Sequence, residues 1–168
     1  MAESFDPRAL LERLAARGVD FVVIGAVAAR LFGATRITED LDICFSTAKP
    51  NLAALGEVMV GLNARLKGID ENLPFVPDER TLSRVQLLTL ATDHGELDVL
   101  TRPSGAPPYE ELKRRSKLVD IGSTAVHVAA LEDLIAMKEA AGRDKDLLDL
   151  QELRKVRRLR RRVGSNDE

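Results

Sequence analysis

The amino-acid sequence predicts an α+β (α/β) domain in which helices flank a mixed, largely antiparallel sheet and a pair of helices ends the chain. Four segments have the length and apolar content of strands: residues 19–24, 40–45, 85–90 and 96–100. The last two flank the turn Asp93-His94-Gly95, which is the pattern of a β-hairpin. Gly142 separates two helical patterns, at residues 131–141 and 145–162.

The size and composition of the chain favour one domain. Its 168 residues are 45% hydrophobic, which is enough for one well-buried core but too few for two domains of ordinary size. We therefore expect a single domain over residues 1–163, with 130–163 as its C-terminal helical part, and a disordered tail at 164–168. With five Phe, one Tyr and no Trp, the core must be built from Leu, Val, Ile and Ala.

The N-terminal half predicts two further helices. The first follows Asp6, which would cap it, has Pro7 at its first position and ends at Gly18. Apolar residues at helical spacing predict another helix over 50–66. An irregular connection is expected over 68–78.

The C-terminal half predicts small elements before the final helices. Residues 109–115 form a short helical pattern, and two short strands are expected at 118–121 and 125–128. Asp144 is the expected N-cap of the last helix.

Asp40 and Asp42 are spaced to point to the same face of their strand, because side chains alternate across a strand with period two. Two carboxylates on one face repel each other, and each raises the pKa of the other. A close pair beside buried apolar residues therefore indicates a divalent metal site. The alternative is a pair of strand-edge acids that discourage pairing with another chain.

Asp98 lies on the second strand of the predicted hairpin. In this strand, at 96–100, Leu97 and Val99 would face one side, and Glu96 and Asp98 the other. Hairpin strands often carry acids on their solvent face, which is the alternative to a catalytic role for Asp98.

A glycine turn lies upstream of these aspartates. Gly25 and Ala26 follow the apolar run at 19–24 and turn the chain into a short helix that ends at Gly33. Backbone N–H groups in such a turn can hold phosphate. Together with a metal site, this predicts phosphoryl or nucleotidyl chemistry.

Gly25-Ala26, a spacer, Asp40-Leu41-Asp42 and the later Asp98 resemble, in this order, the hallmark of the nucleotidyltransferase superfamily. The resemblance implies that Asp40 and Asp42 bind Mg²⁺ (or Mn²⁺) with a nucleoside triphosphate, and that Asp98 completes the metal site and helps activate the attacking hydroxyl. It also implies that Gly25 and Ala26 hold phosphate. In that chemistry, metal ions neutralise charge on the entering and leaving oxygens.

Ala26 departs from the family pattern, which usually has Ser or Gly at this position. Alanine keeps its backbone N–H but lacks a hydroxyl, which could contribute about 1–3 kcal/mol to binding a charged phosphate oxygen.

Residues 131–150 are similar to the Lys…Arg…Lys/Arg-Asp-x-x-Asp-Leu segment of AbiEii/AbiGii-type nucleotidyltransferases, a group that includes toxins of toxin–antitoxin systems. By this resemblance Lys138 and Lys145 would approach the triphosphate. Asp146 and Asp149 would orient these basic side chains or join the catalytic acids. The alternative is a solvated Lys138, with Asp146 and Asp149 favouring the first turns of the last helix through its dipole.

Arg36 and Thr38 lie in the loop before the two aspartates. A cation there could contact a phosphate, and a hydroxyl could bond a carboxylate; the alternative is an exposed loop. His94 and His127 have no Cys or His partner at zinc-site spacing, so a turn and a core role are expected for them.

The net charge of −2 hides a basic segment at 154–162, which holds seven basic residues and no acid. One helical stripe is basic and a second is apolar: Arg154, Arg157, Arg158 and Arg161, against Leu153, Val156 and Leu159. We expect the apolar stripe to pack on the domain. The basic stripe is either a solvated face or a site for the backbone of RNA or DNA.

No apolar run approaches the roughly 18 residues that a helix needs to span a bilayer, and no apolar stretch follows a basic N-terminus. We therefore expect a cytoplasmic protein with no membrane partner. Its single cysteine, Cys44, is expected to be free, buried and inert.

These observations predict a metal-dependent enzyme that moves a nucleoside monophosphate from a nucleoside triphosphate, such as ATP, to a hydroxyl. The acceptor would be tRNA or a protein, or a small molecule such as an antibiotic, and an antitoxin or toxin partner is implied by the resemblance. One alternative is a catalytically impaired binding or regulatory module of the same fold. Another is an RNA- or DNA-binding protein that uses its Arg-rich C-terminal helix.

Overall fold

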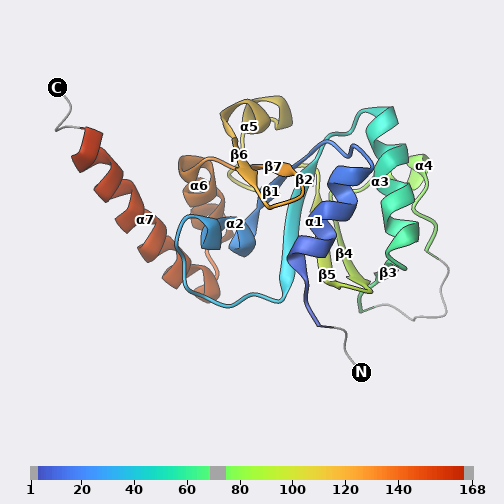
Figure 1. Cartoon of the computed structure of the whole chain (residues 1–168), viewed down its shortest axis with the longest axis horizontal. Helices are drawn as coiled ribbons and strands as arrows, with labels where there is room; N and C mark the ends of the chain where they lie inside the picture. Colours follow the sequence, from blue (N-terminus) through green and yellow to red (C-terminus); the bar gives the residue numbers. More distant parts are fainter. Residues whose placement is uncertain (1–3, 69–74, 165–168) are drawn as a thin grey trace.

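The computed structural model describes residues 4–68 and 75–164 (Figure 1). The helices of this part are α1 (Pro7–Ala16), α2 (Gly25–Leu31), α3 (Lys49–Gly61), α4 (Glu79–Leu82), α5 (Tyr109–Arg115), α6 (Leu131–Ala141) and α7 (Asp144–Gly164). The strands are β1 (Phe21–Ile24), β2 (Asp40–Phe45), β3 (Arg65–Leu66), β4 (Leu87–Thr92), β5 (Gly95–Leu100), β6 (Lys117–Asp120) and β7 (Ala125–Val128).

The strands form one sheet in the order β3-β4-β5-β2-β1-β7-β6. β2 pairs with β5 and β1 with β7 in parallel, whereas the other neighbouring pairs are antiparallel. The predicted α+β class with a mixed, largely antiparallel sheet is therefore confirmed. β2 lies near the centre of the sheet, so its aspartates are not edge-strand acids.

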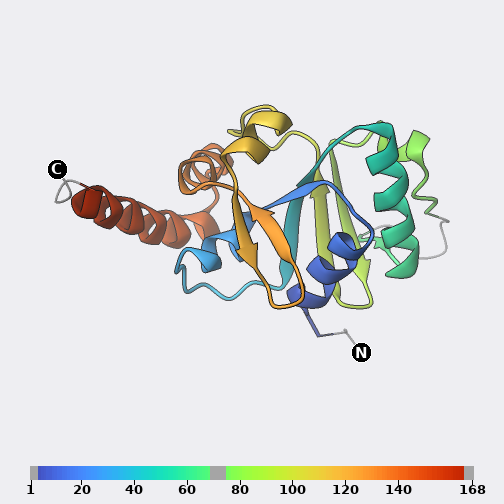
Figure 2. The same cartoon turned by 45° about the horizontal axis from the view of Figure 1, so that its top comes forward.

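The helices α3 and α4 lie toward one end of the molecule and α6 and α7 toward the other, with α5 between them (Figures 1 and 2). α1 packs on α3 and β2, whereas α2 contacts β1, β2 and the C-terminal pair α6 and α7. The core beneath them is mainly aliphatic, as the composition predicts, with Phe21 and Phe45 as its buried aromatic side chains. None of the described helices is both long and apolar enough to cross a membrane.

Local signals explain the first helix. The side chain of Asp6 accepts a hydrogen bond from the backbone N–H of Ala9 at 3.0 Å, Pro7 occupies the first turn, and Gly18 follows with φ of 67°. The predicted cap is thus confirmed, and it satisfies an N–H group that a helix start leaves without a partner.

The helix predicted over 50–66 is too long. α3 ends at Gly61, Asn63 has a left-handed backbone with φ of 52°, and Arg65–Leu66 form β3. Leu62 is buried in the turn after α3, and Leu66 is partly buried in β3. Their spacing matches the apolar spacing of the helix, which explains why the sequence predicted a longer helix.

Other boundaries differ by smaller amounts. The strand predicted at 85–90 is β4, at Leu87–Thr92, and Asp144 lies in the first turn of α7 rather than before it. A short helix, α4, was missed; the side chain of Asp78 caps it by accepting from Thr81 N–H. Part of the predicted connection, residues 69–74, lies outside the described residues. The same holds for residues 165–168 of the predicted tail, whereas Gly164 belongs to α7.

The last turns of α7 extend away from the domain (Figures 1 and 2). Leu153 is buried and Val156 is partly buried, but Leu159 is 51% exposed, so its predicted packing on the domain is wrong. The apolar stripe of α7 therefore extends beyond the part of the helix that packs on the domain.

Gly56 of α3 provides a test of the packing. A Cβ at Gly56 would lie 2.2 Å from the carbonyl oxygen of Pro77, whereas a Cβ at Gly61 of the same helix would meet nothing within 4 Å. We expect Gly56→Ala to lower the free energy of unfolding in urea by about 1–3 kcal/mol, despite the better helix propensity of alanine. Gly61→Ala, the matched control, should raise it by about 0.4–1 kcal/mol. Equal stability of the two variants would contradict this packing.

Candidate active site

Three carboxylates converge on one face of the sheet. Asp40 and Asp42 lie on β2, and the parallel register with β5 places Asp42 directly opposite Asp98. One oxygen of each carboxylate lies within 4.8 Å of the other two. The alternation along β2 therefore brings both predicted aspartates to the face that Asp98 shares.

The protonation of these groups reflects their crowding. Burial, followed by the negative charges of Asp40 and Asp98, raises the pKa of Asp42 to about 8. Burial also raises the pKa of Asp98. Without a cation, one carboxylate of the group stays protonated at neutral pH because adjacent buried charges cannot all be ionised.

The residues present fit a divalent cation. Three carboxylates supply the hard oxygen ligands that Mg²⁺ and Mn²⁺ take. Oδ1 of Asp98 is buried without a hydrogen-bond partner among the described residues, as expected of an atom whose natural partner is an ion. The hydroxyl of Thr38 donates to Oδ1 of Asp40 at 2.7 Å and orients that carboxylate, in agreement with the contact proposed from sequence.

Gly25 adjoins the carboxylates at the point where β1 gives way to α2. Its φ is 70°, and a Cβ on it would lie 2.1 Å from Oδ2 of Asp42. Only glycine fits this position, both for its backbone and for its space. Ala26, the next residue, is buried in the first turn of α2.

A cavity of about 370 Å³ opens beside the carboxylates. Its polar wall includes Asp42, Asp98, Lys138 and Arg143. Its other lining residues are mainly apolar or small: Ile24, Gly25, Leu87, Leu100, Pro103, Ser104, Leu134, Met137 and Ala141. Residues of the sheet and of the C-terminal helices thus line one cavity, which has both charged and apolar side chains in its lining.

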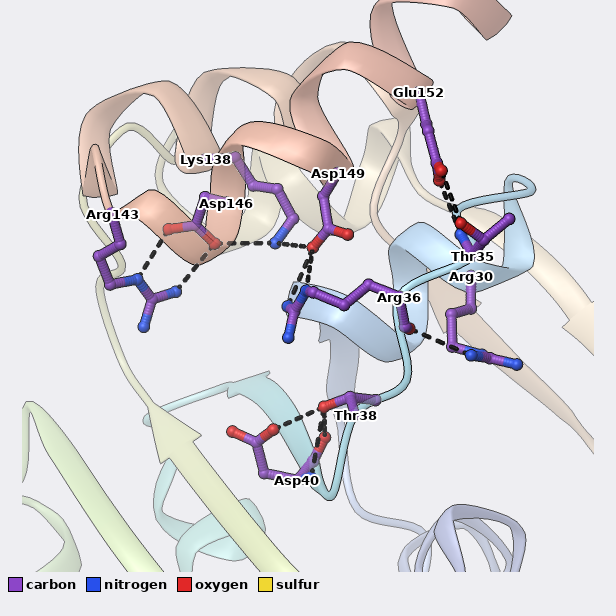
Figure 3. Close-up of polar contacts among 10 residues, drawn as sticks. All are labelled: Arg30, Thr35, Arg36, Thr38, Asp40, Lys138, Arg143, Asp146, Asp149 and Glu152. Carbon is purple, nitrogen blue, oxygen red and sulfur yellow. Dashed lines mark hydrogen bonds and ion pairs between the residues drawn. The ribbon is translucent and has the colours of Figure 1, made fainter.

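Lys138 lies between two aspartates of α7 (Figure 3). Its Nζ is 3.2 Å from Oδ1 of Asp146 and 3.0 Å from Oδ2 of Asp149, and all three side chains are almost fully buried. The reading of Lys138 as a solvated helix residue is therefore wrong. Asp146 and Asp149 do more than complement the helix dipole, since they neutralise a buried ammonium group.

Two arginines complete this network (Figure 3). Arg143 donates to both oxygens of Asp146, and Arg36 donates to Oδ2 of Asp149 from Nε and Nη2. Burial opposes ionisation of Asp146, but the hydrogen bonds from Arg143 and Lys138 outweigh it and hold its pKa below the usual value. Of the two roles open to Asp146 and Asp149, orienting basic side chains therefore matches their contacts, and neither belongs to the cluster of three carboxylates.

The remaining predicted residues differ in whether they line the cavity. Lys145 is exposed and does not line it. Arg36 reaches the network through Asp149 rather than lining the cavity itself. Arg143 does line it and was not singled out from the sequence; its only signal was its place in the Lys…Arg…Lys-Asp segment.

Residues outside the site have structural roles. Cys44 is buried, as predicted, and burial raises the pKa of its thiol to about 12. Nδ1 of His127 lies 2.8 Å from the hydroxyl of Ser116, and His94 lies in the turn between β4 and β5. In the basic stripe, Arg154 pairs with Glu139, and Arg157 and Arg161 lie near Glu132, so α6 neutralises part of it.

Comparisons with known proteins agree with this architecture. The family model described as "Nucleotidyl transferase AbiEii toxin, Type IV TA system" matches residues 9–161. No curated protein sequence matches significantly.

Several solved structures share the fold at low sequence identity. ANT(2″)-Ia in complex with adenylyl-2″-tobramycin superposes with a TM-score of 0.53 at 18% identity, covering 95% of each chain. The lincosamide antibiotic adenylyltransferase LnuA, lincomycin-bound, has a TM-score of 0.60 at 10% identity, covering 92% of this chain and 99% of its own. An antigenic nucleotidyltransferase-like protein from Paracoccidioides brasiliensis has a TM-score of 0.55 at 17% identity, covering 90% and 73%.

The raised pKa of Asp42 predicts how stability depends on pH. The folded chain holds the Asp42 proton up to about pH 8, whereas the unfolded chain releases it near the ordinary aspartate pKa of 3.8. The stability that this proton contributes is thus complete below about pH 4 and is lost as pH rises toward 8. In EDTA, thermal unfolding of the parent should show this decline relative to Asp42→Asn. Parallel profiles for the two proteins would contradict the raised pKa.

The buried ammonium of Lys138 predicts a large difference between two lysines. Lys138→Met would leave Asp146 and Asp149 buried without it, and we expect the free energy of unfolding to fall by about 3 kcal/mol. Lys145→Met, on the exposed face of α7, should change it by less than about 0.5 kcal/mol. Urea unfolding followed by circular dichroism measures both. A similar loss in the two variants would show that the network adds no stability of its own.

Proposed function

The chain belongs to the AbiEii family of nucleotidyltransferase toxins, and on this premise we propose that it transfers a nucleoside monophosphate from a nucleoside triphosphate to a hydroxyl of tRNA or of a protein. The observation that carries the proposal is the convergence of Asp40, Asp42 and Asp98 within 4.8 Å beside a cavity that also holds Lys138 and Arg143. Carboxylates that could bind a metal ion thus lie next to basic side chains that could bind a phosphate.

In this proposal Asp40, Asp42 and Asp98 hold Mg²⁺ or Mn²⁺. The metal, when bound, neutralises charge on the phosphate being transferred and on the leaving pyrophosphate. Asp98, opposite Asp42 on the neighbouring strand, is the proposed third ligand or the general base for the acceptor hydroxyl. Thr38 holds the Asp40 carboxylate in place.

The triphosphate would lie along the polar wall of the cavity. Backbone N–H groups at Gly25 and Ala26 are the proposed cradle, and Arg143 and Lys138 the stabilising cations. Lys138 shares its charge with Asp146 and Asp149, so Arg143, with its 56% exposed side chain, is the more available cation. The nucleobase would then contact the apolar lining, including Leu100 and Met137.

The acceptor is proposed from surface charge and family. Lys155, Arg158 and Arg162 are exposed near the end of α7, where a polyanion such as tRNA could bind through its backbone. The toxin–antitoxin family supports an antitoxin partner. Two of the similar solved structures hold adenylyl-2″-tobramycin and lincomycin. A small molecule is therefore one of the acceptors that the test includes.

The second candidate is a binding or regulatory module without turnover. Its support is Ala26, which stands where the family pattern usually has Ser or Gly. The retained carboxylates oppose it, because three crowded acids cost stability when no cation binds them.

Transfer of label from each α-³²P nucleoside triphosphate to total tRNA, to lysate proteins, or to tobramycin and lincomycin as small-molecule acceptors tests the proposal. With Mg²⁺ we expect labelling by the parent, and a loss of at least about 100-fold in Asp42→Asn, whose neutral amide cannot complete the metal site. Asp120→Asn, which changes an exposed carboxylate on β6, is the matched control and should retain activity.

Two outcomes would decide against it. The enzymatic reading fails if no acceptor is labelled and Asp42→Asn binds nucleotide and Mn²⁺ as the parent does. RNA binding that survives Asp40→Asn and Asp42→Asn but disappears when residues 154–168 are deleted would favour a nucleic-acid-binding protein instead.

A further inference from the structure

The segment that precedes Asp40 forms no helix or strand. Residues 32–39 connect α2 to β2, and Gly33 within them has φ of 107°. In the described part of the chain, no backbone N–H of residues 35–39 donates to a backbone carbonyl. Side chains must therefore determine where this loop lies and how it enters β2.

Glu152 of α7 holds the middle of this loop with both carboxylate oxygens (Figure 3). Oε2 accepts the backbone N–H of Thr35, and Oε1 accepts the Thr35 hydroxyl, each at 2.6 Å. Hydrogen bonds to an ionised acceptor are about twice as strong as neutral ones. The contact joins residues that are 117 positions apart in the chain.

The neighbouring contacts extend this attachment to the carboxylates. Arg36, the next loop residue, donates to Asp149 one turn earlier on α7, and its carbonyl accepts from Arg30 of α2 at 3.1 Å. Two residues later, Thr38 donates to Asp40. Polar contacts at Thr35, Arg36 and Thr38 thus lie along the loop between α7 and the first carboxylate of the site (Figure 3).

We propose that Glu152 is a positioning residue of this site: by bonding Thr35, it fixes the 32–39 loop so that the Asp40 carboxylate meets Asp42 and Asp98. The inference rests on the proposed function for its catalytic meaning. Glu152 suits this role better than Asp149, since Asp149 also neutralises the buried Lys138 and its loss would disturb the core.

Hydrogen exchange and metal binding, measured on the full chain, test the proposal. In Glu152→Ala we expect amide exchange across residues 33–39 to be about 10-fold faster, because the loop loses its attachment. The dissociation constant for Mn²⁺ alone, measured by electron paramagnetic resonance, should rise about 3- to 10-fold, which is less than is usual for a residue that bonds a metal ligand directly.

Two variants separate positioning from general destabilisation. Glu152→Gln should restore most of both values, because its amide can accept from the Thr35 N–H and donate to the Thr35 hydroxyl. Glu139→Ala removes the Arg154 ion pair between α6 and α7 without touching the loop, and should leave both values at the parent level. If Glu152→Ala does not fold, Thr35→Val removes one of the two bonds and should show a smaller change in the same direction.

The outcomes distinguish this inference from the proposed function. Exchange and Mn²⁺ affinity in Glu152→Ala that match Glu139→Ala would overturn the positioning role. A parent that binds no Mn²⁺ would instead contradict the metal-dependent function, while faster exchange in Glu152→Ala would still establish the attachment of the loop.

Discussion

Electrostatic repulsion among Asp40, Asp42 and Asp98 is the constraint on which the rest of the site depends. A flexible chain would let these carboxylates separate and hydrate. Here the parallel pairing of β2 with β5 holds Asp42 opposite Asp98, and the absence of a Cβ at Gly25 leaves room for the Asp42 carboxylate. The free energy needed to hold them together comes from the apolar core, to which the opposite face of β2 contributes the fully buried Leu41 and Ile43.

The C-terminal helices belong to the same electrostatic arrangement. Lys138 is buried on α6 and would be costly alone, but Asp146 and Asp149 of α7 neutralise it, and each of these acids also binds an arginine. Burying charges in such a network adds little net stability, whereas losing one member leaves an unpaired charge. The network therefore joins α6 to α7 and to the loop before β2, and it holds Arg143, which lines the cavity.

The family model places the chain among the AbiEii nucleotidyltransferases. Solved structures at 10–18% identity share the fold, although few of their residues are the same. A fold can be kept by many aliphatic cores, but a metal site needs particular oxygen atoms at particular places. Function must therefore be argued from the carboxylates and cations themselves, and the acceptor from exposed surfaces such as the last turns of α7.

The sequence by itself determined the features that depend on neighbouring residues. The cap at Asp6, the glycine turn at Gly25 and the common face of Asp40 and Asp42 follow from local backbone geometry, and the family resemblance added Asp98 and Lys138. The tertiary structure decided what depends on distant contacts: the pairing of β2 with β5, the edge strand β3, the burial of Lys138, and the places of Arg143 and Glu152. Hydrogen bonds between residues more than a hundred positions apart, as between Thr35 and Glu152, leave no periodic signal in the sequence, because their geometry exists only after the sheet and helices have packed.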